Sequence, residues 1–168
     1  MVAQTPQRAS DVESLFRLHE VSLGRFLLGI VGDLELAEDL LQETFATACR
    51  WPARLAEAAT PDAWLFGVAR HHALSALRRR YRLRDALWRA ASHARPEAIV
   101  PESAREGIEL LAPLAPDDRA LVLLRYWYGF TAADIAAITG RSPAAVRKRL
   151  ERCRAVLATE LDRTGDVR

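Results

Sequence analysis

The sequence has few of the residues that mark disulfide-stabilised or metal-binding proteins. It contains 2 cysteines and 4 histidines in 168 residues. Cys49 and Cys153 stand far apart, without the paired spacing of a zinc site or a disulfide framework. We expect both to lie as small apolar residues in helical cores. A redox switch is the alternative, although a reducing cytoplasm disfavours a standing disulfide.

Targeting and membrane signals are also missing. Residues 1–13 lack the apolar core of a signal peptide. No apolar run approaches the roughly 20 residues that cross a bilayer. We therefore expect a cytoplasmic protein that does not enter a membrane.

The signatures of an enzyme are absent as well. The sequence shows no nucleophile–base–acid set, no glycine loop for phosphate and no metal-ligand spacing. His71 and His72 are adjacent, but neighbouring residues diverge by about 100° around a helix. No third ligand accompanies them. We expect neither an enzyme nor a protein that holds a metal or cofactor.

Charge is strongly segregated, although the formal net charge is only +2. Residues 31–50 contain five acids and one base, whereas residues 66–95 contain eight arginines and one acid. Residues 141–154 contain six bases and one acid. One acidic block and two basic blocks indicate a protein partner and a polyanion bound together.

The hydrophobic pattern is helical throughout, because no segment shows sustained alternation typical of strands. A capping box of Ser10 and Glu13 predicts the first helix, Asp33 a second, and Thr60-Pro61 a third. The pattern decays over 85–104 and then returns. The sequence predicts an all-α protein of two helical modules, residues 10–84 and 105–163, joined by a linker over 85–104.

The second module contains the spacing of a helix-turn-helix. Thr131 opens a short helix that ends at Gly140, and Ser142-Pro143 caps a longer helix. A preceding helix stops at Gly129, a predicted C′ glycine.

A helical wheel divides the longer helix into two sides. Val146, Leu150 and Cys153 fall on one side and form the predicted buried stripe. The far side, which would meet the major groove, carries Ala144, Lys148, Glu151 and Arg152, with Arg147 flanking them. Ser142, at the start of the helix, is a further predicted DNA-binding residue. A solvated basic face on an ordinary helical hairpin is the alternative.

The acidic block of the first module has a face of its own. Asp39, Gln42, Glu43 and Ala46 are spaced so that they share one side of the second helix. Simple solvation of a polar side would also explain this spacing.

Three stretches resemble sigma factors of the sigma-70 family, in particular the extracytoplasmic-function (ECF, group IV) class. Residues 35–45 (ELAEDLLQETF) resemble region 2.2, which binds core polymerase. Residues 64–80 (WLFGVARHHALSALRRR) are similar to regions 2.3 to 2.4, and residues 111–157 to region 4. The resemblance covers roughly residues 10–84 and 105–163.

This resemblance implies a function and its partners. By position, Asp39, Gln42 and Glu43 would bind the clamp helices of the polymerase β′ subunit, with further contacts to the β subunit. The −10 element would be melted and held by Trp64, Arg70, His71, Arg78 and Arg79, with the loop at 54–62. Trp64 is equally compatible with a core position. Region 4 would set the 142–155 helix into the −35 major groove, and anti-sigma factors commonly regulate the class.

Three positions depart from the family pattern. His71 stands where the family commonly has Asn, Ser75 where Asp is common, and Glu151 where an aromatic residue or histidine is frequent. The first two lie close to where the −10 base is read and therefore bear on the preferred −10 sequence. An acid at 151 could accept from a cytosine amine or repel phosphate.

Two other binding functions compete with this interpretation. A helix-turn-helix regulator that never touches polymerase explains residues 131–157 but not the acidic helix. A protein-binding scaffold predicts no salt-sensitive DNA affinity, whereas phosphate binding weakens steeply as salt rises.

Overall fold

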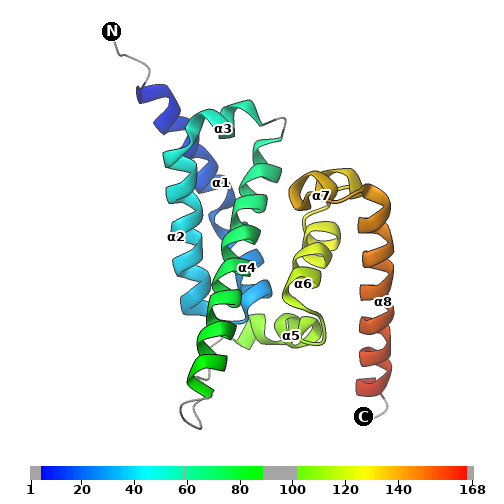
Figure 1. The fold of residues 1–168 in the computed structure, drawn as a ribbon. Coiled ribbons are helices and arrows are strands. Elements are labelled where there is room, and N and C mark those ends of the chain that lie inside the picture. The colour runs from blue at the N-terminus through cyan, green and yellow to red at the C-terminus, as the bar shows by residue number, and fades with distance from the viewer. Residues whose placement is uncertain (1–4, 59, 89–101, 166–168) are drawn as a thin grey trace. The chain divides into compact units, whose positions relative to one another are not determined.

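The computed structural model describes residues 5–58, 60–88 and 102–165, and every regular element in these ranges is a helix (Figure 1). The chain divides into two compact units, Met1–Ile99 and Val100–Arg168. The prediction of an all-α protein with two helical modules is confirmed. No helix in the described ranges has the length and apolar character to span a bilayer.

Unit 1 is a bundle of three long helices and one short helix. They are α1 (Thr5–Val31), α2 (Leu34–Arg50), α3 (Pro52–Glu57) and α4 (Pro61–Trp88). Helices α1, α2 and α4 pack pairwise, and α3 lies against α2 and α4. Edge-to-face contacts of Phe16 with Phe45 and of Phe26 with Phe66, at 4.5 and 5.1 Å, bind the three long helices together. The bundle positions the acidic α2 and the basic α4 side by side.

Helix starts in unit 1 follow the sequence signals only in part. Asp33 caps α2 as predicted, because its Oδ1 accepts from the backbone N–H of Leu36 at 3.0 Å. The predicted start at Ser10 is wrong, since α1 already begins at Thr5. Pro6 suits the first turn of a helix, and this supplies an earlier start signal.

Unit 2 is built from shorter helices. They are α5 (Glu102–Leu111), α6 (Pro116–Val122), the π-helical turn η1 (Leu123–Trp127), α7 (Ala132–Thr139) and α8 (Pro143–Gly165). Arg119 of α6 fastens the end of α5: its guanidinium donates to the carbonyls of Leu111, Ala112 and Leu114, each at 3.0 Å. The Leu111 carbonyl also accepts from the backbone N–H of Leu114 at 3.0 Å, and the arginine adds side-chain donors at this helix end, where carbonyls run short of helical partners.

The predicted linker overlaps helices at both ends. Helix α4 extends to Trp88 and α5 begins at Glu102, so both run into residues 85–104. The middle of this stretch, residues 89–101, lies outside the described residues.

Candidate functional site

The acidic side of α2 is exposed, and its opposite side is core. Asp39, Gln42 and Glu43 are all exposed, as is Ala46. The buried side consists of Ala37, Leu40, Thr44, Phe45 and Ala48. The structure therefore brings the three predicted polymerase-binding residues onto one exposed face.

A link between α2 and α4 was missed by sequence reasoning. The ring of His72 on α4 lies against α2, with Nδ1 3.4 Å from Glu43 Oε1 and Nε2 3.0 Å from Thr47 Oγ1. The sequence placed His72 only beside His71, and nothing in the local pattern indicated a contact with a residue 29 positions earlier.

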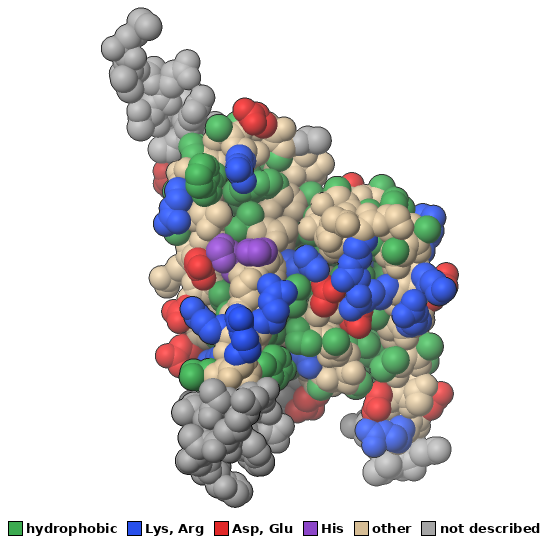
Figure 2. All heavy atoms as spheres, in the orientation of Figure 1, with side chains coloured by type: hydrophobic (Ala, Val, Ile, Leu, Met, Phe, Trp, Pro, Cys, Tyr) green, Lys and Arg blue, Asp and Glu red, His purple; other side chains and the backbone are tan. Residues whose placement is uncertain are grey.

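Helix α4 presents most of its predicted DNA-binding residues at the surface. His71, Arg78 and Arg79 are exposed, whereas Trp64 and Arg70 are half-buried. Figure 2 shows basic side chains gathered over the C-terminal half of α4, with histidine side chains above them. Half-burial of Trp64 leaves part of the indole accessible while the rest packs against the bundle.

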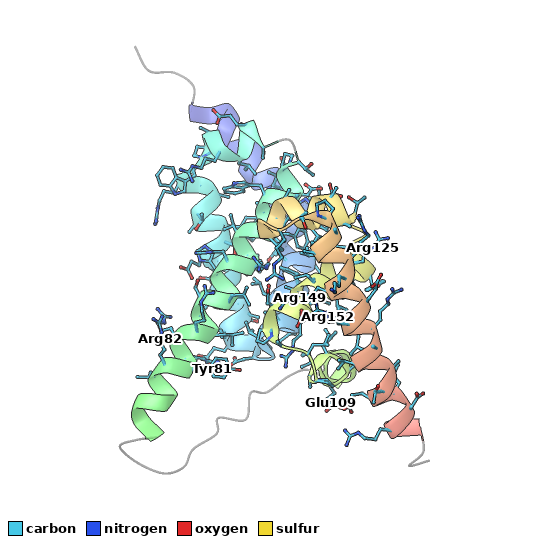
Figure 3. All side chains as sticks on the ribbon, turned by 45° about the vertical axis from the view of Figure 1, so that its right-hand side comes forward. Tyr81, Arg82, Glu109, Arg125, Arg149 and Arg152 are labelled. Atoms are coloured by element: carbon cyan, nitrogen blue, oxygen red, sulfur yellow. The ribbon has the colours of Figure 1, made fainter. Side chains whose placement is uncertain are left out.

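Two arginines of the run at the C-terminal half of α4 contact other side chains of unit 1. Arg80 pairs with Asp33 at 2.7 Å and so holds the start of α2 against α4. Arg78 donates to the hydroxyl of Ser75 at 3.0 Å, so one of the departures from the family pattern contacts a predicted DNA-binding arginine. The exposed surface continues beyond the run, where Tyr81 and Arg82 lie along the end of α4 (Figure 3).

The prediction of a loop over residues 54–62 is wrong, because α3 (Pro52–Glu57) and the start of α4 occupy most of it. Asp62 lies 3.0 Å from the half-buried ring of His19 on α1 and so helps to fix the start of α4. Arg54 lies over the ring of Trp51, 5.1 Å from its centroid. Trp51 is 49% exposed and was not among the predicted site residues.

In unit 2, α7 and α8 form the predicted helix-turn-helix. Thr131 caps α7 in a capping box with Asp134, and Gly140 ends it with φ 67°. Gly129 likewise has a positive φ, of 72°, as predicted for a C′ glycine. The Ser142 hydroxyl accepts from the N–H of Ala145 at 3.2 Å and caps α8. Both predicted helix starts are confirmed.

Helix α8 has the two sides that the helical wheel predicted. Val146, Leu150 and Cys153 are buried. Every predicted DNA-binding position is exposed, namely the capping residue Ser142 and, on α8, Ala144, Arg147, Lys148, Glu151 and Arg152. In the described part of unit 2, no ion pair within the chain engages Arg147, Lys148 or Arg152.

Two of the six basic residues of 141–154 form ion pairs with acids of α6. Arg141 pairs with Asp117 of α6 at 2.6 Å. Arg149 binds Asp118 and also lies 3.4 Å from Asp117. Hydrogen bonding to Asp118 raises the pKa of Arg149 against the opposing effect of burial. Figure 3 labels Arg149 and Arg152 on α8; Arg149 pairs with acids of α6, whereas Arg152 is exposed.

The two cysteines differ in their exposure to solvent. Cys153 is buried as predicted, but Cys49 is exposed near the end of α2, and its prediction as a core residue is wrong. Within the described ranges, no three His, Cys, Asp or Glu side chains come together in a way that could hold a metal ion.

Comparison with known proteins places both units in one family. Residues 15–83 match the family model of sigma-70 region 2, and residues 108–157 match that of sigma-70 region 4. The ECF RNA polymerase sigma factor SigL of Mycobacterium tuberculosis is 30% identical over 167 residues, covering 95% of this chain and 94% of that protein. The RNA polymerase sigma factor CarQ of Myxococcus xanthus is 34% identical over 145 residues, covering 83% of each.

A solved structure has the same fold. It is the sigma factor RpoE of Bartonella quintana in complex with the anti-sigma factor NepR, which aligns with a TM-score of 0.76 and 25% identity. The alignment covers 90% of this chain and 97% of that chain. Sequence, domain order and fold agree, and the chain belongs to the extracytoplasmic-function RNA polymerase sigma factors.

Proposed function

We propose that this sigma factor binds core RNA polymerase through the exposed face of α2 formed by Asp39, Gln42 and Glu43. The observation that supports this most directly is the division of α2 into a buried apolar side and a polar side that the bundle leaves uncovered. The partner surface would be the clamp helices of the β′ subunit, with further contacts to the β subunit.

The −10 element would be held by α4. Exposed His71, Arg78 and Arg79 can follow the freed strand, and half-buried Trp64 and Arg70 border the same helix. Stacking of an unpaired base on an aromatic ring contributes about 1–3 kcal/mol, which offsets the cost of extruding it. Trp64 is accessible enough to stack and anchored enough to keep its orientation.

The −35 element would be read by α8. Arg147, Lys148 and Arg152 would contact nucleobases and phosphates. Ser142 and Ala144 lie at the start of the helix, and Glu151 lies among the basic side chains. Arg141 and Arg149 would act indirectly, because their pairs with α6 orient α8.

Each module would have its own partners. Residues 10–84 would bind polymerase and the −10 element, and residues 105–163 would bind the −35 element. The chain would act in the cytoplasm as a binding protein without catalysis of its own. An anti-sigma factor is a further proposed partner, since the similar RpoE was solved with one. A helix-turn-helix regulator that does not bind polymerase is disfavoured, because it would not account for the region 2 match over 15–83.

Charge reversal tests the polymerase-binding face. Asp39→Lys with Glu43→Lys should weaken binding to core polymerase by about tenfold or more, because opposed charges become like charges at an interface. Binding is measured by fluorescence titration with core polymerase, and far-UV circular dichroism checks the fold. The matched control reverses two exposed acids elsewhere, Glu20 on α1 and Glu109 on α5, of which Figure 3 labels Glu109. An equal loss of polymerase affinity in both variants would contradict the assignment of this face to polymerase binding.

A second pair of variants tests the −35 helix. Arg147→Ala with Lys148→Ala should reduce in vitro transcription from a −35-dependent promoter while binding to core polymerase persists. Arg17→Ala with Arg163→Ala removes the same charge from side chains that are each 77% exposed and lie outside the proposed faces. A parallel fall in core binding and transcription would indicate misfolding instead.

A further inference from the structure

His72 connects the two helices to which the proposed function assigns polymerase and −10 binding. It lies on α4 directly after His71, and its side chain is 17% exposed. Its Nε2 lies 3.0 Å from Thr47 Oγ1, and its Nδ1 lies 3.4 Å from Glu43 Oε1, both on α2. Figure 2 shows histidine side chains at the surface of unit 1 with an acidic side chain beside them.

The hydrogen bonds around Thr47 fix the position of the imidazole proton. The Thr47 hydroxyl donates its single proton to the backbone carbonyl of Glu43 at 2.9 Å. Its oxygen can therefore only accept from His72, so Nε2 of the ring carries the hydrogen. In the neutral ring, Nδ1 is then a lone pair that points toward a carboxylate, and only a protonated ring can donate to Glu43.

We propose that His72 is a positioning residue for the polymerase-binding face: its protonation state decides whether the Glu43 carboxylate is drawn to α4 or is available to a partner. This proposal rests on the proposed function of Glu43. With the ring protonated, Nδ1–H donates to the carboxylate in a charge-assisted bond. With the ring neutral, that bond is lost while the Nε2–H bond to Thr47 remains.

The surroundings of the ring determine which state prevails. Burial lowers the pKa of His72 below that of an ordinary histidine; the Glu43 carboxylate acts to raise it, and His71 acts to lower it further. Among the described residues these two are the charged or titratable groups that act on the ring, one from α2 and one from α4 itself. The ring is therefore mostly neutral at neutral pH, and Glu43 is available.

The sign of the pH effect follows. Lowering the pH through the pKa of His72 adds the proton, draws Glu43 to α4 and places a positive charge beside it. Affinity for a cationic partner surface should then fall. By linkage, polymerase that takes up Glu43 should also disfavour protonation of His72.

The contact itself is tested on the free protein. The pKa of the His72 ring is measured by NMR titration in the wild type and in Glu43→Gln. Removal of the carboxylate should lower the pKa of His72, because Glu43 stabilises the imidazolium. An unchanged pKa would overturn the proposal, whatever happens with polymerase.

The consequence is tested by core-polymerase affinity between pH 8 and pH 6. The wild type should lose roughly two- to fivefold more affinity on acidification than His72→Gln, in line with a partly exposed charge pair. Titration of polymerase itself is common to both proteins and cancels in the comparison. Glu43→Gln should likewise remove this extra pH dependence.

The possible failures can be told apart. Identical pH dependence in wild type and His72→Gln would overturn the positioning role. A shifted His72 pKa with unchanged affinity in Glu43→Gln would overturn it as well, and would place the error in the assignment of Glu43 to the polymerase interface. Retained pH dependence in Glu43→Gln would mean that His72 acts on a different group.

Discussion

At the residue scale, identical side chains have different tasks that only three-dimensional contacts reveal. Arg149 binds acids of α6, whereas Arg147 and Arg152 on the same helix are exposed. Helical spacing was enough to predict the buried Val146 and Leu150, because burial follows from a local periodicity. It could not predict the partner of Arg149, since Asp118 lies 31 residues earlier in the chain.

The two thiols should react at very different rates. Burial, together with the nearby Asp118, raises the pKa of Cys153 to about 11, while Cys49 is exposed. Because the thiolate is the reactive form, we expect Cys153 to react more than about 100-fold more slowly than Cys49 at pH 8. Labelling with a chromogenic disulfide reagent should show one fast thiol in the native protein and two in urea. Cys49→Ser should abolish the fast phase, and two fast phases in the native wild type would contradict the burial of Cys153.

At the element scale, caps and cross-helix pairs determine where helices begin and how they are held. Asp33 combines both tasks, since it caps α2 and binds Arg80 of α4. Burial acts to raise the pKa of Asp33, but the hydrogen bonds from Leu36 and Arg80 outweigh this effect and lower it. Stabilisation by this carboxylate is thus present above about pH 4 and is lost as the pH falls through its lowered pKa.

Two substitutions separate the tasks of Asp33. Asp33→Ala should cost about 0.5–2 kcal/mol at pH 7, because it removes the cap. Asp33→Asn keeps an oxygen for Leu36 but loses the charge, and should cost at most about 1 kcal/mol because Arg80 is largely exposed. Urea unfolding at pH 7 and pH 3 measures both. The difference between wild type and Asp33→Asn should shrink at pH 3; an equal difference at both values would exclude a contribution from the charged pair.

Local signals explain how much of the helix pattern the sequence could predict. Asp33, Thr131 and Gly140 mark real helix ends, because capping depends on residues within one turn. Helix α3 was missed because six residues are too few for a clear periodicity. For the site, the exposed faces of α2 and α8 followed from spacing, but the His72 contact arises only when α4 packs on α2.

At the scale of the whole molecule, two units of one chain would bind different partners. Fold class and the two modules were predictable because helical periodicity runs through both modules and decays between them. The order of the regions followed from the resemblance to sigma factors. The bounds of the linker were predicted less well, because α4 and α5 both extend into the predicted range 85–104.

This arrangement predicts separable salt effects in the holoenzyme. A plot of the logarithm of promoter affinity against the logarithm of salt concentration should become shallower by about one unit for each phosphate contact removed with Arg147 or Lys148. With core polymerase saturating, Asp39→Lys with Glu43→Lys should leave this slope unchanged. Filter binding of holoenzyme at several salt concentrations measures it. A slope that changes equally in both variants would argue against separate roles for the two units.

The grip of Asp117 and Asp118 on Arg141 and Arg149 has a kinetic consequence. Because these pairs with α6 already fix α8, the entropy of ordering this helix is lost once, during folding, and would not be lost again on binding to DNA. If α8 reads the −35 element as proposed, the holoenzyme should associate with and dissociate from successive DNA sequences without reordering this helix each time.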